Sequence, residues 1–243
     1  MIQSGGKGPR LRPYITILPK PLLPVGEHPV LEMLLRWLRR NGAPDVHITT
    51  GDLGHLIRTF CDDGRRWDLN ISYTQEIEPL GTIAALCLLR GVLDETFLVI
   101  NGAVLTDLHL NGFIATHRQH GSALTIATAR GSVRLDFGII EAEQNKSIRL
   151  RKRLGISHLM SKGIYCMEPN LLQHLPCGLP FGFDDLLFRL LDLRIPVGTF
   201  LHNGLWLDIG RIEDFQKAQA LAWDEDAPAY DMTPLTLETM DVV

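Results

Sequence analysis

Apolar and polar positions follow two different periods along the first part of the chain. The segment "HPVLEMLLRWLRRNG" places Leu31, Leu34, Leu35 and Leu38 on one face at helical spacing and closes at Gly42, which predicts an amphipathic helix. Short apolar runs and further helical spacing predict strands at 45–50, 69–75 and 96–100, with helices near 53–61 and 82–89. This alternation is typical of an α/β fold with a mostly parallel sheet flanked by helices.

The pattern changes from Ser122, where β-rich segments follow one another. The segments "SALTIATAR", "FGIIEAE", "KSIRLRKRL" and "KGIYCMEP" predict a smaller β-rich part over about 122–167, forming an antiparallel extension or lid. Helical spacing returns at 183–193, whereas 223–243 is acidic and shows no apolar period, which predicts a mobile tail. The chain therefore predicts one domain over 1–222 followed by that tail.

Composition narrows the class of partner. The chain is 45% hydrophobic and 21% charged, with a formal charge of −4, which disfavours a general binder of nucleic acid or anionic membranes. A local basic patch would still bind phosphate groups. No apolar run approaches the ~20 residues of a membrane span. We therefore expect no nucleic-acid partner and no membrane partner.

Cysteines and histidines show no metal-binding or disulfide pattern. There is no C-x-x-C or H-E-x-x-H spacing, so we expect neither a zinc site nor a disulfide framework, and a reducing cytoplasm fits best. His117 and His120 lie three apart on a predicted helix, which is more typical of exposed helix residues than of ligands. The four cysteines are Cys61, Cys87, Cys166 and Cys177.

The glycine-rich segment "SGGKGPRLRPYITILPKPLLPVG" is the clearest candidate for chemistry. Glycines let backbone N–H groups approach phosphate closely, and Arg10, Arg12 and Lys20 can neutralise its charge. The spacing matches neither the Rossmann fingerprint nor the Walker motif. The segment therefore indicates a phosphate cradle of another kind, and the alternative is a Gly/Pro-rich surface loop.

The motif order resembles that of the sugar-1-phosphate nucleotidyltransferases. The residues that carry the resemblance are "GGKGPRLRP", "LPKPLLPV", "EPLGT", "NGAVLTDL", "FGII", "GIY" and "WLDIG", from Met1 to about Ala222. The resemblance implies a dinucleotide-binding-like α/β fold with a sugar-side insertion. It also implies a reaction in which a sugar-phosphate oxygen attacks the α-phosphorus of an NTP, pyrophosphate leaves and an NDP-sugar forms. The expected partners are therefore an NTP and a sugar 1-phosphate.

The same resemblance implies roles for individual residues. Arg10 would help to expel pyrophosphate and Lys20 would hold the phosphates, as the catalytic pair. Asp208 would be a metal ligand. The expected nucleotide-binding residues are Gly5, Gly6, Gly8, Glu76, Gly81, Thr82 and Gly102, and the expected sugar-phosphate residues are Gly138, Lys152, Ser161 and Lys162.

Several positions depart from the family pattern. Ala103 stands where the family has a second metal-binding aspartate, so Mg²⁺ (or Mn²⁺) would be held weakly if at all. Pro9 replaces a threonine, which removes a hydroxyl and a backbone N–H from the phosphate loop. The family's Glu-Lys-Pro is missing near "RLRKRLG", and Ser161 stands in place of an asparagine.

These departures leave alternatives to an active transferase. One is a catalytically degenerate subunit that binds a nucleotide or nucleotide sugar and regulates or scaffolds an active paralogue. Another is that Ala103 is a deliberate substitution made to trap substrates, which would explain one position only. A homo-oligomer or an active paralogue is the expected protein partner.

Overall fold

A computed structural model of the chain describes residues 1–6, 11, 14–76, 81–143 and 146–222, with the backbone alone for 133–156. Its centre is a seven-stranded sheet in the order β10-β8-β9-β6-β1-β4-β5. The pairs β1/β4, β4/β5, β1/β6 and β8/β10 are parallel, and β9 runs antiparallel to β6 and β8. The predicted α/β fold with a mostly parallel sheet is confirmed. The strands are β1 (Ile2–Ser4), β4 (Asp45–Thr50), β5 (Asn70–Gln75), β6 (Phe97–Asn101), β8 (Leu124–Glu143), β9 (Lys146–Met167) and β10 (Val197–Leu201).

Two apolar cores cover the two faces of this sheet. Strand alternation turns Ile100 into the first core and its neighbour Val99 into the second. The first core joins the sheet to α1 (Val30–Arg40), α2 (Gly54–Cys61) and α3 (Leu110–His120). The second core joins it to η5 (Ala84–Leu89), η6 (Pro169–His174) and α4 (Phe183–Asp192). Burial on both faces is why β6 is an almost continuous apolar run, FLVIN.

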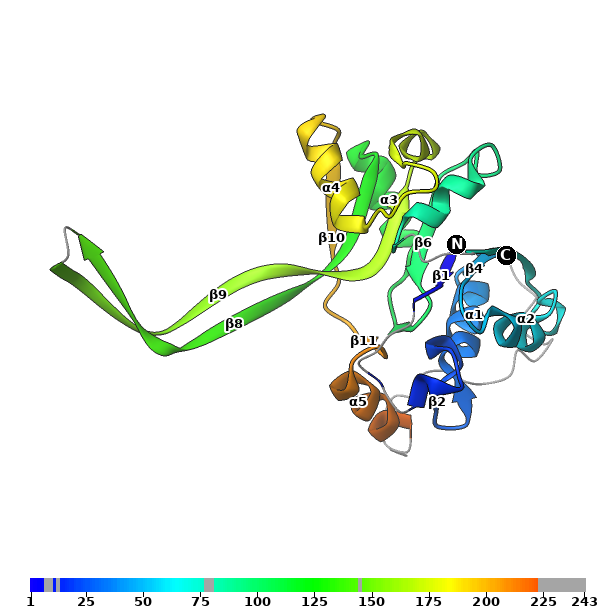
Figure 1. Cartoon of the computed structure of the whole chain (residues 1–243), viewed down its shortest axis with the longest axis horizontal. Coiled ribbons are helices and arrows are strands. Elements are labelled where there is room, and N and C mark those ends of the chain that lie inside the picture. The colour runs from blue at the N-terminus through cyan, green and yellow to red at the C-terminus, as the bar shows by residue number, and fades with distance from the viewer. Residues whose placement is uncertain (7–10, 12–13, 77–80, 144–145, 223–243) are drawn as a thin grey trace.

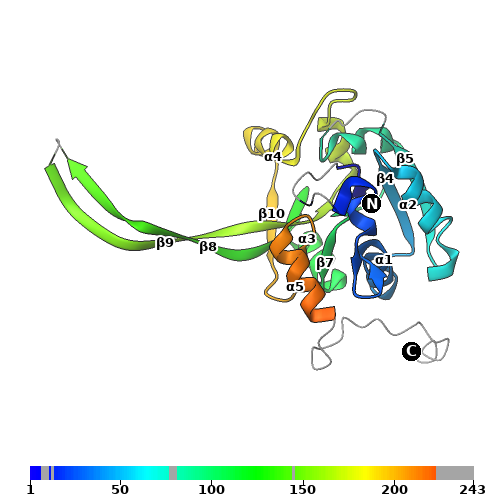
Figure 2. The ribbon, with the colours of Figure 1, turned by 60° about the horizontal axis from the view of Figure 1, so that its bottom comes forward.

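A third core lies beside the sheet under two short strand pairs. The pair β7 (Val104–Thr106) and β11 (Trp206–Asp208) is antiparallel, as is β2 (Pro24–Val25) with β3 (His28–Pro29). The helix α5 (Ile212–Ala222) packs against β11 and β2 and is the orange helix of Figure 2. Two short 3₁₀ turns, η2 (Tyr14–Thr16) and η3 (Lys20–Leu22), belong to the same part of the chain, whereas η4 (Arg65–Trp67) packs Trp67 into the first core.

The β-rich part is a long two-stranded ribbon. The predicted short segments of 122–167 form two strands, β8 and β9, which are antiparallel as expected. They twist around each other and project away from the rest of the protein in both views (Figure 1) (Figure 2). The register shifts at three places, which marks β-bulges along the ribbon. None of the described helices has the length and apolar character needed to cross a membrane.

Two expectations are corrected, and a third is refined. Cys87 and Cys177 form a disulfide with a Cα–Cα distance of 5.6 Å, although their spacing gave no sign of one. His117 is buried, with its ring nitrogens on Thr125 Oγ1 (2.7 Å) and Glu168 Oε1 (2.9 Å), because α3 turns that residue toward the sheet. The helix expected near 82–89 is a 3₁₀ helix, η5. The expected tail, 223–243, lies outside the described residues, and the division at 222 stays a prediction.

Candidate active site

Four parallel strands deliver polar segments to one edge of the sheet. β1 leads into Gly5, β4 into Gly51, β5 into Glu76 and β6 into Gly102. Since the carboxyl ends of parallel strands meet at the same edge, these residues lie together although they are spread over the first hundred positions. Backbone bonds from Glu76 N to Thr50 O (2.8 Å) and from Gly102 N to Gln3 O (2.8 Å) continue the pairing past the strand ends. This edge is where an open α/β sheet binds ligands.

The backbone at Gly5 is packed between two neighbours. A Cβ added to Gly5 would lie 2.7 Å from Glu76 Oε2, and one added to Gly51 would lie 2.8 Å from the Gly5 carbonyl oxygen. A side chain at Gly51 is thus excluded by the backbone of Gly5, whereas one at Gly5 would have to displace the Glu76 carboxylate. Among the described residues, no atom lies within 4 Å of a Cβ added to Gly6. Burial raises the pKa of the Glu76 carboxyl.

Gly81 and Thr82 connect this edge to the start of α4. Gly81 has a positive φ of +96°, and its added Cβ would lie 2.8 Å from the Phe181 carbonyl oxygen. The Thr82 hydroxyl accepts a bond from Phe183 N (3.0 Å), and the Gln3 side-chain amide donates to the Thr82 carbonyl. The predicted nucleotide-binding residues Gly5, Gly6, Glu76, Gly81, Thr82 and Gly102 therefore follow strands or turns that are bonded to β1 or its neighbours.

Lys20 and Asp208 meet over Gly210. A Cβ added to Gly210 would lie 2.9 Å from Asp208 Oδ1 and 3.2 Å from Lys20 Nζ. Asp208 Oδ1 accepts from Gly210 N (2.9 Å), and Asp208 N donates to Asp214 Oδ2 (3.1 Å), so the carboxylate is held by its own turn. A cation from η3 and an anion from β11, far apart in sequence, thus both lie next to Gly210.

Ala103 lies beside Asp208, as a two-carboxylate centre would require. β7 and β11 pair Val104 with Asp208, and Ile209 N donates to the Ala103 carbonyl (2.8 Å). The Ala103 methyl group is buried among Leu105, Leu207 and Ile209, which supply no oxygen ligand. Over the described ranges, no group of three or more His, Cys, Asp or Glu side chains comes together to hold a metal ion.

This donor set does not fit a metal ion held by the protein itself. Mg²⁺ requires octahedral oxygen coordination. The described residues bring the Asp208 carboxylate next to a lysine ammonium, and the nearby Asp214 carboxylate already accepts from Asp208 N. The position that would supply the second ligand holds a buried methyl group. The ammonium of Lys20 is the cation that the described residues place here.

The sugar-side candidates lie on β9 next to the end of β6. Ser161 Oγ donates to Tyr165 Oη (3.2 Å) and accepts from Gly163 N (3.3 Å). Gly163 has a φ of +69° and presses on the Asn101 side chain, where any Cβ would collide. Ser161 is thus fixed beside the Asn-Gly turn that follows β6.

Lys162 is buried and its ammonium already has a partner. Its Nζ lies 2.6 Å from His202 Nδ1, and His202 Nε2 lies 2.9 Å from Asp107 Oδ1. Its carbonyl accepts from Trp206 Nε1 (2.7 Å), two residues before Asp208. Burial lowers the pKa of Lys162, opposed by the charge of Asp107, and burial followed by the Lys162 charge lowers the pKa of His202.

Other predicted residues are not brought to this edge by described contacts. Gly138 and Lys152 are paired with each other in the β8–β9 ribbon, and their side-chain surroundings lie outside the described part. Gly8 and Arg10, with the Pro9 substitution, also lie outside the described residues. Their expected roles stay predictions.

Sequence reasoning missed Ser4, Gln3 and His202. The Ser4 hydroxyl is buried, has no hydrogen-bond partner among the described residues, and lies against Gly102. Each of these three takes its importance from a neighbour remote in the sequence, so no spacing rule would have found it.

Comparison with known proteins decides the family. The sequence profile described as nucleotidyl transferase matches residues 1–225. The chain belongs to the nucleotidyl transferase family. A UTP–glucose-1-phosphate uridylyltransferase from Synechocystis is 28% identical over 238 residues, covering 90% of this chain and 61% of the relative. A mannose-1-phosphate guanyltransferase beta-B from Xenopus laevis is 27% identical over 223 residues, covering 88% and 62%. The chain thus spans about three fifths of these curated relatives.

Solved structures agree on the fold of this nucleotidyl transferase. A Bacillus anthracis protein described as a glucose-1-phosphate thymidylyltransferase, in complex with a sucrose, superimposes with a TM-score of 0.72 at 24% identity, covering 92% of this chain and 94% of that one. HddC from Yersinia pseudotuberculosis superimposes with a TM-score of 0.70 at 22% identity, covering 90% and 96%. At this identity the likeness establishes the architecture.

Proposed function

We propose that the chain transfers a nucleoside monophosphate from an NTP to a sugar 1-phosphate. A sugar-phosphate oxygen forms a bond to the α-phosphorus, the bond from that phosphorus to the bridging oxygen breaks, and pyrophosphate leaves with the negative charge. Such a transfer needs positioning and charge neutralisation more than covalent help. The curated relatives, a uridylyltransferase and a guanyltransferase of sugar 1-phosphates, support this reaction class.

The meeting of Lys20 and Asp208 over Gly210 is the observation that carries the proposal. Lys20 would neutralise the phosphates and Arg10 would assist the leaving pyrophosphate. Backbone N–H groups of Gly5, Gly6 and Gly8 would hold the triphosphate, because glycine allows close approach. The remaining proposed contacts are Glu76, Gly81, Thr82 and Gly102 for the nucleoside, and Gly138, Lys152 and Ser161 for the sugar phosphate.

A binding subunit without turnover is the second candidate, and the buried methyl group of Ala103 favours it. Under that alternative the same edge would retain a nucleotide or nucleotide sugar. A cytoplasmic location, and a homo-oligomer or active paralogue as protein partner, belong to the proposal under either candidate.

Pyrophosphate release tests the reaction. A panel of NTPs and sugar 1-phosphates, with Mg²⁺ or Mn²⁺ added, is assayed with the natural chain and with Lys20→Ala. Loss of one positioned charge partner should lower kcat by about 100-fold. The matched control is Lys217→Ala, which removes an exposed lysine from α5 and should leave the rate unchanged. An unaffected rate in Lys20→Ala would contradict the assignment of this residue.

Ala103→Asp separates the two candidate functions. Restoring a carboxylate next to Val104, the residue that pairs with Asp208, should tighten Mg²⁺ binding, because the ion then gains a second anionic oxygen in this part of the protein. Turnover by the natural chain supports the transferase. Turnover that is seen only in Ala103→Asp would show that the fold is intact and lacks one metal-binding carboxylate. Nucleotide binding with no turnover in either protein supports the binding subunit.

A further inference from the structure

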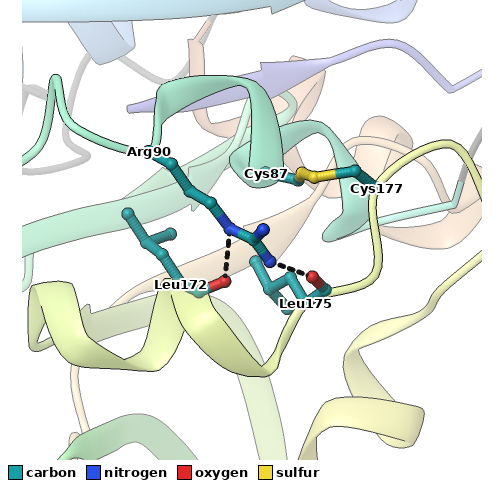
Figure 3. Close-up of a disulfide and its surroundings, with 5 residues drawn as sticks. All are labelled: Cys87, Arg90, Leu172, Leu175 and Cys177. Carbon is teal, nitrogen blue, oxygen red and sulfur yellow. Dashed lines mark hydrogen bonds between the residues drawn. A yellow bond between two sulfur atoms is a disulfide. The ribbon is translucent and has the colours of Figure 1, made fainter.

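We propose that Cys87 and Cys177 form a thiol–disulfide exchange site that clamps residues 177–183 onto the nucleotide-side turn at 81–83. The nucleotide consequence rests on the function proposed above. Cys87 belongs to η5, directly after that turn, and Cys177 follows η6, ninety positions along the chain. Figure 3 shows the disulfide bridging these two elements.

The clamped segment lies on the turn through its far end. Ile83 N donates to Phe181 O (3.4 Å), Phe183 N donates to the Thr82 hydroxyl (3.0 Å), and Gly81 abuts the Phe181 carbonyl. Phe183 also stacks on Tyr165, with ring centroids 4.0 Å apart. The disulfide therefore closes a small circuit in which 177–183 and 81–87 hold each other at both ends.

Arg90 holds the chain up to Leu175 independently of the disulfide. The Arg90 guanidinium donates to the carbonyls of Leu172 (3.0 Å) and Leu175 (Figure 3). These bonds do not depend on the oxidation state, so the chain stays attached up to Leu175. Between Leu175 and Phe181 the disulfide is the covalent attachment, and the intervening residues 177–180 are exposed. Loss of the bond should loosen this stretch first.

The two sulfur atoms differ in access. Cys87 is buried at 5% exposure, whereas Cys177 is exposed. A thiolate of a dithiol reductant can therefore attack Cys177 Sγ, which breaks the protein disulfide and releases Cys87 as a thiolate that takes up a proton. The second thiol of the reductant then attacks the mixed disulfide and releases Cys177. Two electrons pass to the protein, and the dithiol becomes a disulfide.

The other described cysteines do not compete for this exchange. Cys61 and Cys166 are fully buried in the first core, and burial raises the pKa of each thiol to about 12. Neither is ionised near neutral pH, and the thiolate is the reacting form. Exchange is thereby confined to Cys87 and Cys177. In a reducing cytoplasm a pair of this kind acts as a sensor of oxidation and not as a permanent staple.

Hydrogen exchange on the full chain tests the clamp without any nucleotide. Peptide mapping without reductant should show 87 linked to 177, and dithiothreitol should then speed amide exchange at 177–183 and 81–83 while α1 stays unchanged. In Cys177→Ser, a change at an exposed position, the amide exchange rates should equal those of the reduced protein and should not change when dithiothreitol is added. Free thiols at both positions in the air-oxidised protein, or equal exchange in the two states, would overturn the clamp.

Nucleotide affinity tests the coupling to the site. For the NTP that the protein binds best, reduction should weaken binding by about fivefold or more, the lower end of ordinary coupling between sites. Cys177→Ser should show the weaker affinity in both states. Unchanged affinity despite faster exchange would overturn the control of the site. Absence of nucleotide binding in both states would reject the proposed function. The amide hydrogen exchange experiment would then be the test of the clamp.

Discussion

Lys162, His202 and Asp107 show how one buried residue can organise three parts of the chain. A lysine ammonium has no acceptor, so His202 Nδ1 must accept from Lys162 and His202 Nε2–H must donate to the Asp107 carboxylate. The positive and negative ends thus balance across a neutral imidazole. These three side chains join β9, the segment after β10 and the segment after β7. They lie next to β11, the strand that carries Asp208, because the Lys162 carbonyl accepts from Trp206 Nε1. The ammonium of Lys162 is thus engaged by His202, and its expected contact with a sugar phosphate stays a prediction.

Removing the lysine charge should raise the pKa of His202. The groups that act on this imidazole are Lys162 and His109, which disfavour its protonation, and Asp107, which favours it. In Lys162→Met the apolar stem remains and the attraction of Asp107 is no longer opposed by the ammonium. NMR titration of the His202 ring should therefore give a higher pKa in Lys162→Met than in the natural chain. Lys217→Met is the exposed control, and an unchanged or lower pKa in Lys162→Met would refute the charge chain.

At the scale of elements, local periodicity predicted what local structure decides. The strand expected at 45–50 is β4, and the helix expected at 183–193 is α4, because each bears an apolar pattern that is readable within a few residues. The patterns were weakest where tertiary contacts decide the outcome. Cys87 and Cys177 become neighbours only when η5 and the segment after η6 pack together, and no spacing of cysteines encodes that contact. His117 was misjudged because a helix face is assigned by its apolar residues, and this one carries a buried polar group.

The turn at 81–83 gives a prediction about two glycines of similar conformation. Gly81 (φ +96°) and Gly91 (φ +77°) both adopt the left-handed region, but only Gly81 has a neighbour, the Phe181 carbonyl, in the way of a Cβ. Alanine should strain the backbone at both sites, and at Gly81 it should also displace Phe181. Urea unfolding should show Gly81→Ala less stable than Gly91→Ala by about 1 kcal/mol or more, the usual cost of overpacking. Equal losses in the two variants would mean that the contact contributes nothing.

Across the whole molecule, the fold placed residues that the sequence could only nominate. Lys20, Ala103 and Asp208 were chosen by resemblance. The pairing of β7 with β11 places Ala103 next to the partner residue of Asp208, and η3 places Lys20 next to Gly210, as Asp208 is. Ser4 was not nominated, although its unpartnered hydroxyl lies at the same edge of the sheet. The end of a strand can be predicted from the local sequence. Which strands lie next to it depends on the strand order, which is a property of the complete sheet.

Ligand-induced stabilisation extends the argument to the whole chain. A ligand that binds only the folded state stabilises it by about 2.7 kcal/mol at a concentration 100 times its Kd, so the best NTP should raise the Tm by several degrees. Because Glu76, Gly81 and Thr82 are proposed to contact the nucleoside, the four NTPs should differ in this shift, whereas pyrophosphate alone should give a smaller one. Differential scanning fluorimetry with each NTP, each NDP-sugar and pyrophosphate measures the order. A shift with pyrophosphate equal to that with every NTP would show that the edge holds phosphate without reading the base. The absence of any shift would remove both candidate functions, since a transferase and a binding subunit must each hold a nucleotide in the folded state.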